Sequence, residues 1–163
     1  MDRYDQLQPA ALVASIDSMP RRWKDAMHVS LDKNIDDYFT VETDAGSVAE
    51  HLGATIAQLR LLRDAIRTTA YNVPEPLDPA VLAAAANRGS GPWPQSAKSG
   101  LADLAEEIEE LKGELDRVSV RDWNKTALAG DQSVSLIQLV QGASRVAADR
   151  LSVVERLVRS LAN

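Results

Sequence analysis

The sequence predicts an all-α protein, a four-helix bundle with one long crossover connection. Apolar residues recur at alternating steps of three and four in four segments, so helices are expected at about 8–27, 47–69, 97–118 and 131–162. Aromatic residues make up only 4 % of the chain, and its apolar share comes mostly from Ala, Leu and Val. This composition favours helix-on-helix packing over a sheet sandwich, and no segment shows the alternation of a half-buried strand.

Composition also limits the function. The 163 residues are enough for a single domain, 1–163, with a substantial core. The net charge of −6 would repel a phosphate backbone, so we expect no nucleic acid as partner. Without cysteine, disulfides, thiolate nucleophiles and Cys-ligated zinc are excluded. The polar beginning of the chain and the lack of long apolar runs predict a soluble, cytoplasmic protein that does not bind a membrane.

The first helix, 8–27, begins with Pro9 in its first turn and contains a second proline, Pro20. A proline inside a helix removes a hydrogen bond and clashes with the preceding turn, which predicts a kink or a break near 18–19. The stripe of this helix consists of Leu12, Ile16, Met19 and Trp23.

The second helix, 47–69, opens with a capping box in which Ser47 and Glu50 satisfy each other's backbone amides. Three arginines, Arg60, Arg63 and Arg67, lie beside the apolar stripe and form a basic edge, which is either a solvated face or a site for an anionic ligand. The stripe itself consists of Val48, Leu52, Thr55, Leu59, Leu62 and Ile66.

Segment 71–99 is rich in Pro and Gly, and only 79–86 within it has the composition of a short helix. A connection of this length is usually functional or mobile. We expect a strap that crosses one end of the bundle, with Trp93 either capping a pocket or anchoring the strap.

The third helix, 97–118, places its acidic residues opposite its apolar stripe. A charge run in that position is usually solvated, and catalytic carboxylates need desolvation, so no chemistry is assigned to them. The acidic residues are Glu106, Glu107, Glu109, Glu110 and Glu114, and the stripe is Leu101, Leu104, Ile108, Leu111, Leu115 and Val118.

The last helix, 131–162, is predicted to begin at a cap on Asp131 or Ser133, after segment 121–130 has turned the chain. The middle of its stripe, 142–148, carries small residues, so either a partner approaches closely there or a pocket opens. The stripe consists of Ile137, Val140, Ser144, Ala147, Leu151, Val154, Val158 and Leu161.

The chain has two histidines, His28 and His51. His51 lies at the edge of the second stripe, where a lone histidine is more often a partly buried hydrogen-bonding residue than a ligand or a base. No local pattern supports a catalytic triad, and no catalytic residue is assigned.

Three features occur in the order seen in a known superfamily: the segment 47–53 that opens the second helix, the acidic third helix ending near 120–123, and Gly130 followed by Ser133 and Val134. Together they resemble the DinB/YfiT-like superfamily, including its mycothiol-dependent maleylpyruvate isomerase branch. The resemblance implies a four-helix bundle with a long crossover, frequent homodimers, and a zinc or nickel ion used in thiol-dependent chemistry.

In that family one metal ligand is a histidine on the second helix and two more lie four residues apart on the last helix. The matching positions here are Ala54, Val146 and Arg150, none of which binds a metal. We therefore expect a diverged member with a degenerate metal site and no cofactor.

The resulting hypothesis is a metal-free relative that binds an anionic small molecule. Its candidate ligand-binding residues are His51, Trp123, Asp149 and Arg150. A buried Arg150 needs a partner, which would be Asp149, Glu50 or a bound anion. Two alternatives stay open: a thiol-dependent transferase or isomerase acting through His51 or Arg150, and a dimeric interaction module that meets its partner through the strap.

Overall fold

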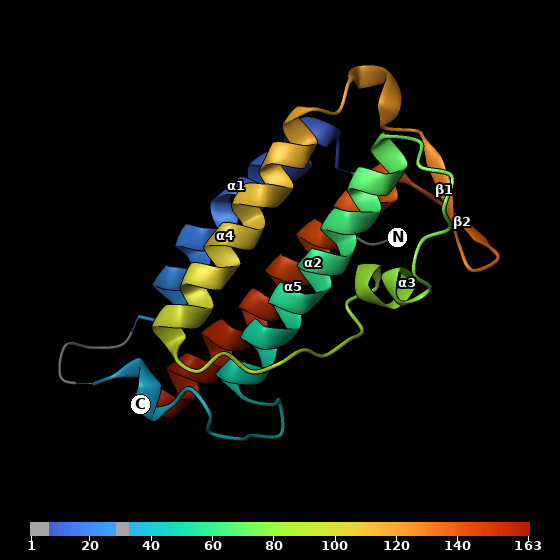
Figure 1. Cartoon of the computed structure of the whole chain (residues 1–163). Coiled ribbons are helices and arrows are strands. Elements are labelled where there is room, and N and C mark those ends of the chain that lie inside the picture. Colours follow the sequence, from blue (N-terminus) through green and yellow to red (C-terminus); the bar gives the residue numbers. More distant parts are fainter. Residues whose placement is uncertain (1–6, 29–32) are drawn as a thin grey trace.

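The computed structural model describes residues 7–28 and 33–163 and is mostly helical (Figure 1). The predicted all-α class is confirmed. Most of the start of the chain, whose polar character was used above, lies outside the described residues. Four long helices pack side by side: α1 (Pro9–Ala26), α2 (Val48–Ala70), α4 (Ala97–Asp116) and α5 (Leu136–Ala162). Among the described residues, none of the helices is both long and apolar enough to cross a membrane.

The predicted apolar stripes form the core. All the stripe positions of α1 and α2 are buried, and so are the central positions of α4 and α5, whereas Leu101, Ile137 and Leu161 at the helix ends are only partly buried. Of the kink or break predicted near 18–19, the break is wrong, because the helix continues through Pro20 to Ala26. Ser47 caps α2 by accepting a hydrogen bond from the Glu50 amide, which is one half of the predicted capping box.

The last helix begins later than predicted. Residues 126–135 form a hairpin of β1 (Thr126–Ala129) and β2 (Gln132–Ser135), and α5 follows at Leu136 with Ser135 as its cap. The cap is therefore neither Asp131 nor Ser133. A two-residue turn joins the strands, and Gly130 has a φ of 66° there, a conformation that glycine adopts without steric cost.

The strap runs along the helices and does not simply cross one end. Its backbone joins the hairpin where the Leu77 amide donates to Leu128 O (2.8 Å), and it then forms the short helix α3 (Ala80–Ala85). Figure 1 shows it continuing beside α2 toward the beginning of α4. Close contact of Gly91 with Gly53 holds this last part against α2. The strap has this length because α2 and α4 are parallel, so the chain must return from one end of the helices to the other.

The small residues of α5 are the place where other elements approach closely. A Cβ on Gly142 would lie 2.8 Å from both Cα and Cβ of Ala85 on α3. On the α1 side, the hydroxyls of Ser144 and Ser15 are 3.0 Å apart, and the Trp23 indole donates to Ala147 O (3.1 Å). The small residues at 142–148 were predicted to allow either a close approach or a pocket, and the structure shows a close approach.

We expect Gly142→Ala to lower the free energy of unfolding by about 1–3 kcal/mol, because its methyl group would overlap the backbone of Ala85. Gly113→Ala is the matched control in α4, where a Cβ meets nothing within 4 Å. That substitution should raise the free energy of unfolding by about 0.5–1 kcal/mol through helix propensity. Urea denaturation measures both changes, and equal effects at the two glycines would contradict the close packing of α3 on α5.

Candidate functional site

Arg150 of α5 is the centre of a polar cluster between α2, α5 and the strap. Its guanidinium donates to Gln58 Oε1 and Asn87 Oδ1 through Nε (both 2.9 Å) and to Gly89 O through Nη2 (3.0 Å). Its Nη1 lies 3.1 Å from His51 Nδ1. All four acceptors are neutral groups. Through them Arg150 of α5 is linked to α2 and to the strap.

The sequence brings these groups together in a simple way. His51 and Gln58 are seven residues apart on α2, so they lie on one face with Ala54 between them. Because Ala54 is small and buried, it leaves room in front of α2 for the Arg150 side chain. Asn87 follows α3 with a φ of 57°, the left-handed conformation that asparagine tolerates, and this turn leads directly to Gly89.

The two hydrogen bonds of His51 define its tautomer. Nε2 lies 2.6 Å from Ala45 O, which can only accept, and Nδ1 lies next to Arg150 Nη1, which can only donate. His51 must therefore be neutral with its proton on Nε2. Both ring nitrogens are engaged, so the side chain offers no free basic nitrogen to a thiol. It is the partly buried hydrogen-bonding residue that its position in the sequence predicts.

Gln58 contributes an unsatisfied donor to the cluster. Its Oε1 accepts from Arg150, and this contact fixes the orientation of the amide, because a flipped amide would point two donors at a cation. The Gln58 Nε2 group is then buried with no hydrogen-bond partner among the described residues. Such a group is normally paired in a folded protein, so it is an unused donor beside Arg150.

The cluster carries positive charge with little direct compensation. Burial lowers the pKa of Arg150, and Glu50 opposes this shift through its negative charge without bonding to the guanidinium. An arginine stays protonated in proteins, so the half-buried group remains a cation. Among the described residues, the hydrogen-bond partners of Arg150 are therefore the neutral groups and not the predicted Glu50 or Asp149.

The structure brings only some of the candidate residues together. His51 and Arg150 are in contact, whereas Asp149, which is partly buried, is not one of the groups that bond to the guanidinium. Trp123 lies elsewhere, because its carbonyl accepts from the Ile137 amide at the beginning of α5, about 20 Å along the helix from Arg150. Gln58, Asn87 and Gly89 were missed from the sequence. The signal for Gln58 was a polar residue on a buried helix face.

The donor set does not fit a metal ion. The three positions that match the family's ligands hold Ala54, Val146 and Arg150, and both nitrogens of the nearby His51 are engaged. No group of three or more potential His, Cys, Asp or Glu ligands occurs in the part of the chain that the structure describes. A cation on Arg150 would also repel a metal ion at this place.

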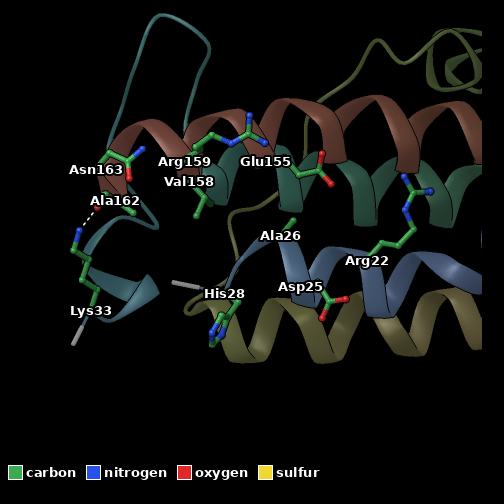
Figure 2. Close-up of a pocket in the computed structure, with 10 residues that line it drawn as sticks. All are labelled: Arg22, Asp25, Ala26, His28, Lys33, Glu155, Val158, Arg159, Ala162 and Asn163. Atoms are coloured by element: carbon green, nitrogen blue, oxygen red, sulfur yellow. Dashed lines mark hydrogen bonds between the residues drawn. The ribbon is translucent and has the colours of Figure 1, made fainter. Parts of the chain in front are cut away.

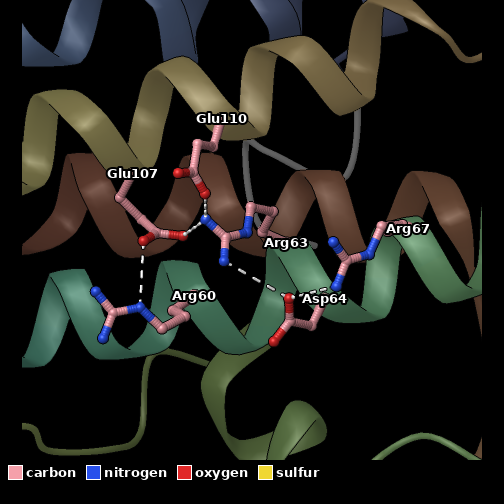
Figure 3. Close-up of polar contacts among 6 residues, drawn as sticks. All are labelled: Arg60, Arg63, Asp64, Arg67, Glu107 and Glu110. Atoms are coloured by element: carbon pink, nitrogen blue, oxygen red, sulfur yellow. Dashed lines mark hydrogen bonds and ion pairs between the residues drawn. The ribbon is translucent and has the colours of Figure 1, made fainter.

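A second polar cluster joins α2 to α4 and corrects two predictions. Glu107 was expected on a solvated face, yet it is buried, and it pairs with Arg63 Nη1 (2.7 Å) and Arg60 Nε (3.3 Å). Arg63, expected on a basic edge, is mostly buried and also pairs with Glu110 (Figure 3). Burial raises the pKa of Glu107 above its ordinary value, and the charges of Arg63 and Arg60 offset part of the rise.

Two cavities of the described structure lie apart from Arg150. One of about 680 Å³ opens between the ends of α1 and α5, where Arg22, Asp25, Glu155 and Arg159 mix both signs of charge (Figure 2). It borders His28 and Lys33, and the segment 29–32 between them lies outside the described residues, so no ligand is assigned to it. Another of about 370 Å³ lies beside Trp93, which is 44 % exposed. Trp93 was expected either to cap a pocket or to anchor the strap, and it lines this cavity.

Comparison of the chain with protein-family models, with curated proteins and with solved structures found no match in any of the three. The resemblance to the DinB/YfiT-like superfamily therefore rests on the sequence features given above.

We expect the purified, untagged protein to retain no stoichiometric zinc or nickel after incubation with either ion and dialysis, as measured by elemental mass spectrometry. The reason is the donor set around Arg150, which contains a cation and an engaged histidine. One equivalent of metal that is lost in a His51→Ala variant would contradict this assignment.

The buried Glu107 predicts a pH dependence of stability. Because its pKa is raised in the folded protein, the stability it contributes is present below about pH 4.5, the ordinary value, and is lost as the pH rises through the folded pKa. The free energy of unfolding of the wild type, relative to Glu107→Gln, should therefore fall as the pH rises above that value. Urea denaturation at several pH values measures it.

Glu109→Gln is the matched control, because Glu109 is exposed on the same helix and its loss also removes one charge from α4. A wild-type advantage over Glu107→Gln that grows with pH would mean that Arg63 and Arg60 outweigh burial.

Proposed function

We propose that this chain is a non-catalytic, metal-free relative of the DinB/YfiT-like proteins that binds a small anion at Arg150. In this proposal the four long helices form a four-helix bundle of that type, and the strap is its long crossover. The order of the helices and the long return from the end of α2 to the beginning of α4 support this view.

The observation that carries the proposal is a set of donors with no anionic hydrogen-bond partner in the described part of the chain. Arg150 uses three of its five N–H groups on neutral acceptors, and the buried Gln58 Nε2 beside it has no acceptor among the described residues. A cation and an orphaned donor at one place favour a ligand that brings negatively charged oxygens. The Arg150 contact with Gly89 O lies at the surface, where such a ligand can approach.

A phosphate or a carboxylate suits these donors best. Guanidinium groups bind such anions through two parallel hydrogen bonds, and partial burial strengthens the interaction. A cationic ligand would be repelled by Arg150, and a neutral ligand would add nothing to the partial compensation that Glu50 provides. The thiol-dependent enzyme is less well supported, since both nitrogens of His51 are engaged. The dimeric interaction module remains a further alternative from the sequence.

We expect inorganic phosphate to bind the wild type in isothermal titration calorimetry and Arg150→Gln to weaken that binding by at least about tenfold. Gln58→Glu should also abolish binding, because the new carboxylate would occupy the place of the anion and pair with Arg150. The same variant should unfold at a temperature no lower than that of the wild type, since an internal counter-ion replaces an orphaned donor.

Arg145→Gln is the matched control, because Arg145 lies on the same helix and contacts the Ala85 carbonyl of α3, outside the Arg150 cluster. It should leave phosphate binding unchanged. Absence of binding to the wild type, with destabilisation by Arg150→Gln, would instead make Arg150 a purely structural tie between the strap and the helices. Equal loss of binding in the Arg145 and Arg150 variants would also refute the proposed site.

A further inference from the structure

The cavity beside Trp93, called here the Trp93 groove, is lined by α2, the strap and α4 and is separate from the Arg150 cluster. Ile56, Ala57 and Arg60 line it from α2, Pro92, Trp93 and Pro94 line it from the strap, and Asp103 is on the α4 side. Its volume of about 370 Å³ falls within the range of small-molecule sites, about 300–1,000 Å³.

The wall of the groove is held rigidly. A Cβ on Gly53 would lie 2.4 Å from Pro92 O, so the backbone of the strap rests directly on α2. Pro92 and Pro94 restrict the backbone on both sides of Trp93. The indole therefore stays partly exposed at a fixed place without being part of the core, and it presents an aromatic surface to a ligand.

The charged groups of the groove have unused capacity. Arg60 is 59 % exposed and meets Glu107 only through Nε, while its two terminal nitrogens have no partner among the described residues (Figure 3). Asp103 lies one turn before Glu107 on α4, is exposed, and forms no ion pair with any described residue. An available cation and an available anion thus line one groove with an aromatic wall.

We propose that the Trp93 groove binds a zwitterionic α-amino acid with an aromatic side chain. Its carboxylate would take the terminal nitrogens of Arg60, its ammonium group would face Asp103, and its ring would lie against Trp93. A simple anion would be repelled by Asp103 and Glu107, and a simple cation would be repelled by Arg60. This site is independent of the proposed anion site at Arg150.

Three probes that share one phenyl ring test the proposal by calorimetry: L-phenylalanine, 3-phenylpropionate without the ammonium group, and phenethylamine without the carboxylate. We expect phenylalanine to bind most tightly. Arg60→Gln and Trp93→Ala should each weaken its binding by at least about tenfold. Asp103→Asn should weaken phenylalanine but not 3-phenylpropionate, since only phenylalanine carries the ammonium group.

Arg67→Gln is the matched control, because Arg67 is a similarly exposed arginine on α2 that pairs with Asp64 and does not line the groove. It should bind phenylalanine like the wild type, and so should Arg150→Gln, which separates this test from that of the Arg150 site. If Arg60→Gln fails to fold, Trp93→Ala still tests the proposal, because the partly exposed indole adds little to the core. Equal affinities for the three probes, or no binding of phenylalanine up to about 10 mM, would overturn the proposal.

Discussion

Both α1 and the strap pack closely against the middle of α5, and this packing places them relative to the other helices. Gly142 lets α3 approach with backbone contact, and Ser144 and Ala147 let α1 approach through Ser15 and the Trp23 indole. Larger side chains at these positions would force the neighbouring elements outward, since protein interiors have no spare volume to absorb them. Because α3 belongs to the strap, its contact with α5 also determines where the following residues, 87–95, meet α2.

Arg150 follows these small residues on α5 and also links the strap to the long helices. Its guanidinium links Gln58 and His51 of α2 to Asn87 and Gly89 of the strap through neutral groups. Neutral acceptors satisfy hydrogen bonds but add no negative charge, so Arg150 is balanced only in part by the nearby, unbonded Glu50. In the proposed function this half-buried charge favours an anion from solution. Structural and binding roles of Arg150 are compatible, since the bonds that hold the strap leave two N–H groups of the guanidinium for a ligand.

The two polar clusters differ in how their charges are compensated. Glu107 lies between Arg63 and Arg60, so the link between α2 and α4 contains its own counter-ions. Among the described residues, no carboxylate hydrogen-bonds to the guanidinium in the Arg150 cluster. Arg60 belongs to the first cluster through Nε and also lines the Trp93 groove. Its pair with the buried Glu107 therefore orients a guanidinium that borders the groove.

The all-α class and the core stripes of the long helices could be predicted from the sequence, because helical periodicity is a local property. For the small residues of α5 the sequence left two possibilities, a close approach or a pocket, and the structure decided for the close approach. Arg150 was singled out by the resemblance to the DinB/YfiT-like superfamily, whose matching position holds a metal ligand. The hairpin 126–135, the burial of Glu107, and Gln58, Asn87 and Gly89 as partners of Arg150 were decided only by the tertiary structure. Each of these features depends on which segment lies opposite. A strand needs a neighbouring strand, and a carboxylate is buried only where arginines face it. The carbonyl that accepts from Arg150 belongs to Gly89, 61 residues earlier in the chain.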